Sequence, residues 1–145
     1  MRLSTRGRYG LKAMYQLACH YGEGPIPLNS IAEEQALSEN YLEQLVATLR
    51  KEGLLNSVRG AQGGYMLAKP PEDITVGNIL RILEGDLAPA DCVVDEEYEC
   101  AKEENCVTKL VWMRIRDSID SVIDSITLKD MLDESKKTTV NKTEI

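Results

Sequence analysis

The segment LNSIAEEQALSENYLEQLVATLRKEGLLNSVRGAQGGYML, residues 28–67, decides the fold of this chain. It contains two helical patterns joined by a short turn, followed by two apolar runs on either side of a glycine-rich loop. Ser38 is predicted to cap the second helix, because a serine oxygen accepts a backbone N–H from the first helical turn. This order predicts a helix-turn-helix over about 28–51 and a β-hairpin wing over about 54–67, which together form a winged helix-turn-helix.

The second helix of this segment has one apolar and one polar face. Its apolar side chains fall at helical spacing, which predicts one buried stripe of Leu42, Leu45, Val46 and Leu49. The opposite face carries Asn40, Gln44, Ala47 and Lys51, flanked by Glu43 and Thr48. Polar tips near the helix N-terminus with small residues behind them are typical of a helix that enters a DNA major groove.

The wing carries Arg59 at its shoulder, beside a loop with Gly60, Gly63 and Gly64. A guanidinium on a thin, glycine-rich ribbon can reach a minor groove or a phosphate. We therefore expect double-stranded DNA to be the partner of this surface. The alternative interpretation is a pair of surface helices and a hairpin that do not bind DNA.

The charge of the chain is divided unevenly. The net charge is −7, but residues 1–70 hold eight Lys/Arg and six Asp/Glu, whereas residues 71–145 hold nine and eighteen. A basic front and an acidic back suit a protein that binds a polyanion on one side only.

No apolar run approaches the roughly 18 residues of a membrane span, and the N-terminus lacks a signal peptide, so we expect a cytoplasmic protein without a membrane partner. The sequence contains no Ser/His/Asp set and no phosphate-binding glycine loop, so an enzyme is not expected.

Two further helices are predicted to complete a DNA-binding domain over residues 1–85. A first helix from Thr5 to about Tyr21 is expected to bury a stripe of Leu11, Met14, Tyr15 and Ala18. A short helix from Val76 to Glu84 follows the wing, because Thr75 is a suitable N-cap and Gly85 a suitable helix end.

The C-terminal part is predicted to hold a dimerisation helix. Residues 106–133 read as a long helix followed by a short helix that ends near Leu132. The long helix has a narrow apolar stripe of Val111, Ile115, Ile119, Val122 and Ile126, which suits a helix that crosses a second copy of the chain. The polar residues 134–145 are expected to form a disordered tail.

Three of the four cysteines lie close together, spaced C-x7-C-x5-C at Cys92, Cys100 and Cys106. They fall within residues 86–106, a stretch without periodicity that is predicted to be a sensor loop. A disulfide framework is not expected without a signal peptide, and the spacing departs from the C-x2–4-C pairs of structural zinc sites. Three thiolates on one loop can hold an iron–sulfur cluster with a fourth ligand from elsewhere, and reactive thiols without metal are the alternative.

Three stretches, MRLSTRGRYGLKAM, SENYLEQLVATLRKEGLLNSVRGAQGGYML and ITVGNILRILEG, resemble the IscR-like (Rrf2) family of bacterial winged-helix regulators. The resemblance runs from Met1 to about Leu132. Members are homodimers that bind pseudo-palindromic operators, so it implies a mainly α-helical, homodimeric transcription regulator with a small β-hairpin wing. It implies DNA contacts at Ser38, Asn40, Tyr41, Glu43 and Gln44 on the recognition helix and at Arg59 and Gly60 on the wing.

The resemblance also implies a use for the cysteines. In cluster-binding members three cysteines hold a 2Fe–2S centre, and Cys92, Cys100 and Cys106 match them, although the first spacing here is two residues longer. The usual fourth ligand is a histidine three residues after the third cysteine, where this chain has Lys109. The fourth ligand therefore stays open between a loop acid, His20 and a group of the other subunit.

We expect a homodimeric regulator that senses iron–sulfur or redox status through this cluster. The first alternative is a cluster-free repressor of cysteine or sulfur metabolism that acts through thiols or a partner enzyme. The second is a small iron–sulfur electron carrier, which would need the cysteines but no DNA-reading surface. The helix-turn-helix, within the net-positive residues 1–70, argues against the electron carrier.

Overall fold

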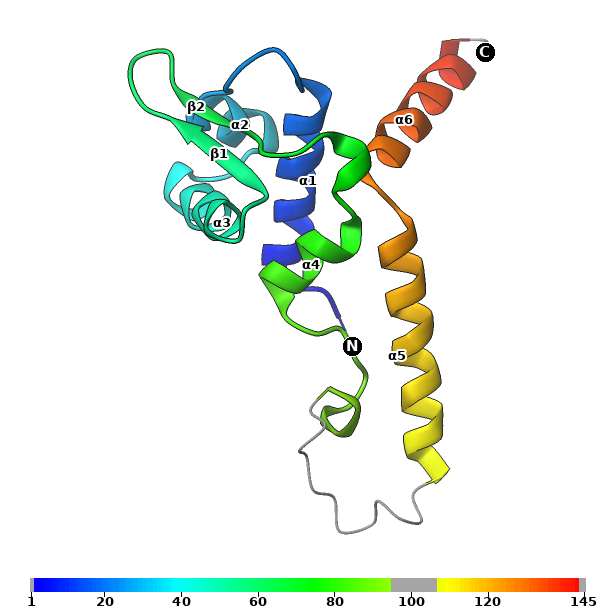
Figure 1. The fold of residues 1–145 in the computed structure, drawn as a ribbon. Helices are drawn as coiled ribbons and strands as arrows, with labels where there is room; N and C mark the ends of the chain where they lie inside the picture. The colour runs from blue at the N-terminus through cyan, green and yellow to red at the C-terminus, as the bar shows by residue number, and fades with distance from the viewer. Residues whose placement is uncertain (1, 95–106, 144–145) are drawn as a thin grey trace.

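The computed structural model describes residues 2–94 and 107–143, which form six α-helices, two short 3-10 helices and one two-stranded sheet (Figure 1). The elements follow in the order α1 (Thr5–Cys19), α2 (Leu28–Gln35), α3 (Glu39–Lys51), β1 (Leu55–Val58), β2 (Gly64–Leu67), η1 (Pro71–Asp73), α4 (Val76–Glu84), η2 (Asp91–Val93), α5 (Val107–Ser125) and α6 (Leu128–Thr143). The predicted class, mainly α with a small β-hairpin, is confirmed.

Helix α1 lies at the centre of the N-terminal body, in contact with α2, α3, α4, α6 and β2. Because neighbours cover it on several sides, its buried face is wider than the predicted stripe and includes Ala13, Met14, Gln16, Leu17 and Ala18. Leu11 and Tyr15, which were expected to be buried, are only half-buried. Gln16 is tolerated inside because its amide hydrogen-bonds the side chains of Glu34, at 2.7 Å, and Gln35, at 2.9 Å.

The helix-turn-helix forms as the sequence predicts. Ala36, with φ of 54°, turns the chain at the end of α2, and Ser38 then caps α3 by accepting the backbone N–H of Tyr41 at 3.2 Å. All four apolar residues of the predicted α3 stripe are fully buried: Leu42, Leu45, Val46 and Leu49. The cap and the stripe are both confirmed, because each depends only on residues within one turn of α3.

The wing is an antiparallel hairpin in which Leu55 faces Leu67 and Val58 faces Gly64. It gains a third partner that the sequence did not suggest. Ile26, in the link between α1 and α2, exchanges two backbone hydrogen bonds with Tyr65, at 2.8 and 2.9 Å. These bonds attach β2, near the loop end of the hairpin, to the link between α1 and α2.

Helix α4 is delimited as predicted, by Thr75 and Gly85. The Thr75 hydroxyl accepts the backbone N–H of Asn78 at 3.0 Å, and the Asn78 side chain accepts that of Thr75 at 2.9 Å. This reciprocal pair is a capping box, with asparagine in the position usually held by glutamate or glutamine.

The chain leaves this body after α4 and returns to it at the junction of α5 and α6. Two backbone hydrogen bonds close the return, from Val76 N to Ile126 O at 2.8 Å and from Leu128 N to Ile74 O at 3.0 Å. Leu128 is fully buried in the same core as α1 and α3. The core of the DNA-binding domain expected over residues 1–85 is therefore completed by a residue from the C-terminal part.

The structure differs from the sequence-based expectation at the C-terminus. The last helix was expected to end near Leu132, with a disordered tail over 134–145, but α6 continues to Thr143. Leu128 and Met131 pack against the core, and α6 lies against α1. An ion pair at helical spacing between Lys129 and Asp133, at 2.9 Å, adds local support.

Candidate functional site

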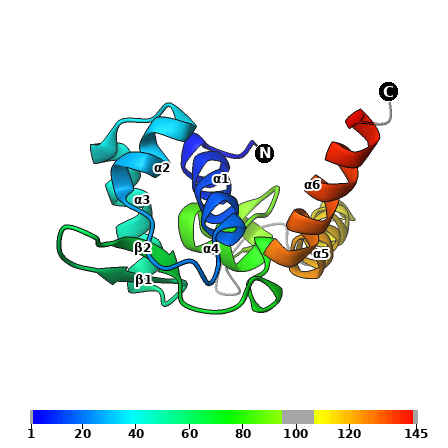
Figure 2. The same cartoon turned by 90° about the horizontal axis from the view of Figure 1, so that it is seen from above.

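The surface expected to read DNA is exposed and continuous across α3 and the wing. Figures 1 and 2 place α3 and the β1–β2 hairpin on one side of the body, with α5 and α6 on the opposite side. Of the predicted contact residues, Tyr41 is half-buried and the others are exposed: Ser38, Asn40, Glu43, Gln44, Arg59 and Gly60. The fold therefore brings every predicted DNA-contact residue to one accessible side.

Two side-chain contacts hold this surface in place. The Tyr41 hydroxyl donates to Thr5 Oγ1 at 3.1 Å, and the Tyr41 ring packs edge-on against Tyr9 with 6.3 Å between ring centres. Both partners belong to α1, which therefore sets the position of the first turn of α3. Neither contact could be read from the sequence, because Tyr41 lies more than thirty residues from either partner.

The wing is joined to α3 by Arg50, whose Nη1 donates to Ser57 Oγ on β1 at 2.9 Å. Arg50 is the basic residue of α3 two turns after Glu43, and it donates to the wing here. Within residues 2–94 and 107–143, Glu43 makes no ion pair. Its carboxylate is exposed on the side of α3 that faces away from the core.

At the wing tip, Gly60 has φ of 108°, a conformation that an L side chain rarely adopts. The turn at Gly60 leaves Arg59 exposed at the end of β1. A long cation at the tip of a hairpin whose second strand is held by the Ile26–Tyr65 bridge can reach a phosphate or a minor groove beside α3.

The candidate cluster ligands are described only in part. Cys92 lies in η2 and is half-buried, whereas Cys100 and Cys106 lie outside the described residues. Within residues 2–94 and 107–143, no three His, Cys, Asp or Glu side chains come together as a metal site requires. Whether the three cysteines come together as one ligand set therefore depends on residues 95–106, which lie outside the described residues.

The structure does show how η2, and with it Cys92, is held. Val93 is buried, and its carbonyl accepts a hydrogen bond from Arg116 Nη1 on α5 at 2.9 Å. Arg116 also donates to Asp117 Oδ1, at 2.8 and 3.1 Å. A polar cavity of about 350 Å³ lies beside this contact, lined in part by Asp86, Asp117 and Asp120. Cys92 thus belongs to a segment that is anchored on α5 rather than on the DNA-binding body.

The position of His20 bears on the open question of the fourth ligand. His20 follows the last residue of α1, and its Nδ1 lies 3.0 Å from Glu23 Oε2. Figure 1 shows the C-terminal end of α1 and η2 at opposite ends of the molecule. The structure therefore does not bring His20 to Cys92 within one chain. Lys109 lies in the first turn of α5.

Helix α5 carries an apolar face that the rest of the described chain does not cover. Within the described chain it has no fully buried residue, and the exposed fraction is 74% for Val107, 47% for Val111 and 56% for Val122. The opposite side of α5 packs on α4 through Arg81, Asp120 and Asp124. None of the described helices combines the length and apolar character that crossing a membrane requires.

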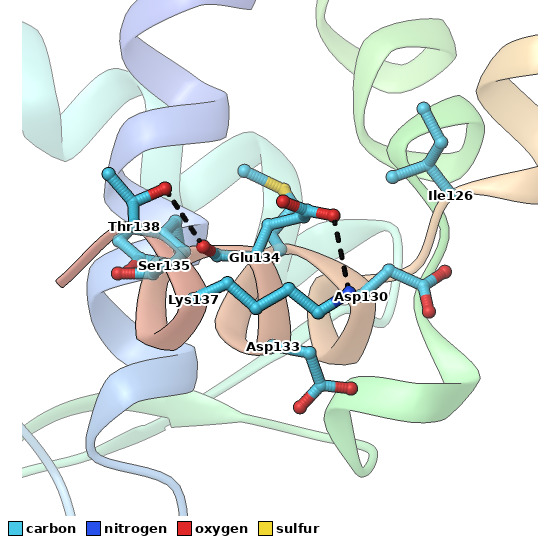
Figure 3. A pocket seen from close by; sticks show the side chains of 9 residues that line it. Ile126, Asp130, Asp133, Glu134, Ser135, Lys137 and Thr138 are labelled. Atoms are coloured by element: carbon cyan, nitrogen blue, oxygen red, sulfur yellow. Dashed lines mark hydrogen bonds and ion pairs between the residues drawn. The ribbon is translucent and has the colours of Figure 1, made fainter. Parts of the chain in front are cut away.

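A groove of about 690 Å³ between α1 and α6 was missed in the sequence (Figure 3). Tyr15, Ile126 and Met131 give it an apolar lining, and acidic side chains stand at its edge. Lys137 and Glu134, 3.7 Å apart, form an ion pair on this rim. The groove was missed because residues from 134 onward were expected to be a disordered tail, whereas Glu134, Ser135, Lys137 and Thr138 line it from α6.

Comparison with known proteins bears out the winged-helix interpretation. The family model for Rrf2, described as "Iron-dependent Transcriptional regulator", matches residues 3–134. CymR of Bacillus subtilis, an HTH-type transcriptional regulator, is 51% identical over 131 residues, 90% of this chain and 89% of CymR. IscR of Erwinia tasmaniensis, with the same description, is 38% identical over 136 residues, 94% of this chain and 81% of IscR.

Solved structures agree with this comparison. T. potens IscR is 52% identical with a TM-score of 0.78, over 95% of this chain and 90% of its own. The structure of B. subtilis CymR is 50% identical with a TM-score of 0.73, over 90% of this chain and 95% of its own.

The fold and its exposed recognition surface therefore define a DNA-binding transcriptional regulator of the winged-helix class. Within that class, the chain belongs to the Rrf2 family, whose matching members include IscR and CymR regulators. The relatives are regulators and not enzymes, as the sequence predicted.

Proposed function

We propose that this protein is a cytoplasmic, homodimeric regulator that binds a pseudo-palindromic operator and senses iron–sulfur or redox status through its cysteine segment. The observation that carries the proposal is the exposed surface of α3 and the wing, where polar and basic side chains stand over a tightly packed core. On this proposal, Ser38, Asn40, Tyr41, Glu43 and Gln44 contact the major groove, and Arg59 and Gly60 contact the adjacent backbone or minor groove.

The homodimer is supported by the uncovered apolar face of α5. Val111, Ile115 and Val122 lie on one side of this helix, and each is more than a third exposed. Burial of apolar surface contributes about 25 cal/mol per Å², so a second copy of the same face is a favourable partner. The apolar-to-charged variant Val122→Asp should yield monomers in size-exclusion chromatography with light scattering. The matched variant Val58→Asp, in an exposed valine of the wing, should stay dimeric.

The ligand set proposed for a 2Fe–2S cluster is Cys92, Cys100 and Cys106, with an oxygen or nitrogen donor as the fourth ligand. Three thiols are the donors that iron–sulfur clusters take, and η2 holds the first of them half-buried beside α5. When bound, the cluster would supply a centre whose presence and oxidation state vary with iron and oxidants. Helix α5 begins at Val107, so the third proposed ligand immediately precedes a helix N-terminus, which favours a thiolate.

The proposed mechanism is a population shift in the dimer. Helix α5 is tied to α4 by Arg81 and to η2 by Arg116, so the arrangement of these elements relates the dimer helix to the DNA-binding body. Two recognition helices bind an operator only when their spacing matches the half-sites. A state of the cysteine segment that favours one α4–α5 arrangement would therefore change operator affinity.

A second candidate function is a cluster-free repressor of cysteine or sulfur metabolism. It is favoured by the 51% identity to B. subtilis CymR, which is described as the global cysteine regulator of that organism. The two candidates share the DNA-binding surface and differ in the use of the cysteines.

One preparation separates the two candidates. We expect protein purified without oxygen to contain iron and acid-labile sulfide and to show visible absorption that Cys92→Ala, Cys100→Ala or Cys106→Ala removes. The matched variant Cys19→Ala should keep the absorption, because the exposed Cys19 lies on α1. Protein that binds no iron after anaerobic reconstitution would support the cluster-free repressor.

DNA binding is tested on the same preparations by selection from a random duplex pool. Enrichment of a pseudo-palindromic site is expected for both candidates. Failure to enrich any sequence with either preparation would contradict the operator-binding proposal.

A further inference from the structure

The N-terminus of α1 is capped by a residue from another helix. Ser4, the N-cap, makes no side-chain hydrogen bond to its own helix. Instead, one carboxylate oxygen of Glu84 accepts three hydrogen bonds, from Ser4 N at 3.0 Å, Gly7 N at 2.9 Å and the Ser4 hydroxyl at 2.5 Å. Gly7 is the third residue of α1, and an N-cap side chain ordinarily accepts the N–H at that position. Glu84 therefore caps α1 from a distance in sequence.

The close approach of α4 to α1 depends on two glycines. A Cβ at Gly7 would lie 2.9 Å from Glu84 Cγ and closer still to Oε1. A Cβ at Gly10 would collide with the side chain of Leu83. Arg6 Nε adds a longer hydrogen bond, 3.4 Å, to the Leu83 carbonyl. The end of α4 thus sits directly on the first two turns of α1.

The same turn of α1 also holds the recognition helix. Thr5, next to Ser4, accepts the hydrogen bond from the Tyr41 hydroxyl, and Tyr9, one turn later, packs against the Tyr41 ring. Glu84 and Tyr41 therefore bind adjacent residues of one helical turn. Any movement of this turn relative to α3 must stretch or break the bond between Thr5 and Tyr41.

Glu84 also stands where the cysteine-bearing segment begins. It is the last residue of α4, and Gly85, with φ of 79°, turns the chain towards η2 and Cys92. A carboxylate at a helix C-terminus is repelled by the dipole of its own helix and attracted by the N-terminus of another. The contact with α1 is therefore what favours the observed position of the Glu84 side chain.

We propose that Glu84 is a positioning residue that transmits the state of the cysteine-bearing segment to the recognition helix. A shift of Gly85 and the following residues pulls the Glu84 carboxylate away from Ser4 and Gly7, which frees the first turn of α1. The link from Thr5 to Tyr41 then passes the change to α3. The inference rests on the proposed sensing function for its input, whereas the contacts that carry it lie between α1, α3 and α4.

The mechanical link can be tested in the protein alone by hydrogen exchange. Glu84→Gln keeps the size of the side chain but removes the charge from the cap. Amides in the first turns of α1 and α3 should then exchange roughly tenfold faster, the effect expected on losing a charge-assisted hydrogen bond. The matched variant Asp86→Asn should exchange like the wild type, because the exposed Asp86 makes no hydrogen bond to α1 in the described structure. Wild-type exchange of Glu84→Gln in both turns would overturn the link.

Gly7→Ala separates a coupling role from a purely structural one. Alanine is the better helix former, so exchange in α1 should slow or stay unchanged if Gly7 merely belongs to the helix. The added Cβ should instead displace the Glu84 carboxylate and reproduce the faster exchange of Glu84→Gln in both turns. Slower or unchanged exchange of Gly7→Ala in both turns would count against the inference.

Transmission is tested by the ratio of operator dissociation constants between two states of the cysteine segment. The states compared are reconstituted and apo protein or, if no iron is bound, protein with free thiols and protein alkylated with iodoacetamide. We expect a wild-type ratio well away from one and a Glu84→Gln ratio near one, with unchanged iron content or alkylation. If Glu84→Gln keeps the wild-type ratio, the transmission through Glu84 is overturned, whereas the proposed sensing function stands. A wild-type ratio of one would overturn the sensing function and, with it, transmission.

Discussion

Arg81 and Asp124 form a two-point ion pair that joins α4 to α5. Nη1 of Arg81 lies 2.6 Å from Oδ1 of Asp124, and Nη2 lies 2.9 Å from Oδ2. Asp120 adds a further contact to Nη2 at 3.1 Å. The hydrogen bond to Arg81 holds the pKa of the Asp124 carboxyl below its ordinary value, and the same bond raises the pKa of the Arg81 guanidinium. The parallel geometry makes this pair the most directional link between the two helices.

The pair should make stability depend on pH in the acid range. Because the pKa of Asp124 is lowered by folding, its contribution is complete above the unfolded pKa, about 3.9, and is lost as the pH falls through the folded value. Asp124 is partly exposed, so Asp124→Asn should cost less than about 1 kcal/mol at pH 7. Urea unfolding from pH 7 to pH 3 should show the wild type approaching the variant. A gap between wild type and Asp124→Asn that is constant over this range would contradict the assignment.

Arg59→Ala should weaken operator binding while leaving the dimer intact. If Arg59 contacts a phosphate, the slope of log K against log salt should become less steep by about 0.9. Fluorescence anisotropy at several salt concentrations measures both affinity and slope. Lys136→Ala removes the same charge from α6, on the opposite side of the body, and should leave the slope unchanged. Equal slopes for wild type and Arg59→Ala would exclude a phosphate contact from the wing.

Glu43→Ala should broaden sequence preference without abolishing binding. The exposed carboxylate makes no ion pair in the described residues, so phosphates repel it unless it accepts a hydrogen bond from a cytosine N4 amine. Sites selected from random DNA by the wild type and by Glu43→Ala should differ at one position of each half-site. Identical motifs would show that Glu43 does not read a base.

Arg116→Gln should expose Cys92 to alkylation. The variant loses the hydrogen bond from Nη1 to the Val93 carbonyl, which holds η2 on α5. A net loss of one such bond should speed the reaction of Cys92 with iodoacetamide between about twofold and tenfold. Peptide mass spectrometry resolves Cys92 from the exposed Cys19, which serves as an internal reference. Arg114→Gln, a neighbouring exposed arginine, is the matched control, and an equal effect there would assign the change to charge alone.

The features predicted correctly from the sequence are those fixed within a few residues. Ser38 caps α3, Thr75 and Gly85 delimit α4, and the hairpin lies where its glycine-rich loop places it. These features depend on local hydrogen bonds and helical spacing, which a single sequence displays. The exposure of Asn40, Glu43, Gln44 and Arg59 followed from the same local pattern.

The features that were missed depend on contacts between distant residues. Glu84 caps α1 across most of the DNA-binding body, and the burial of Gln16 requires two partners on α2. Leu128 and Met131 pack on the core at the start of α6, and the helix continues to Thr143, so a polar tail composition was a poor guide there. None of these contacts produces a periodic pattern of apolar residues from which it could be predicted.

Backbone hydrogen bonds join Val76 to Ile126 and Leu128 to Ile74, so the chain between α4 and α6 is a long loop whose two ends are held together on the DNA-binding body. The entropy of closing a loop changes only with the logarithm of its length, so two added residues in so long a loop cost well under about 0.1 kcal/mol. The two additional residues between Cys92 and Cys100 therefore hardly change the stability of the DNA-binding body. Insertions and deletions in this loop can alter what the protein responds to while the DNA-binding body keeps its fold. The cysteine segment is therefore the part of the chain most open to evolutionary change.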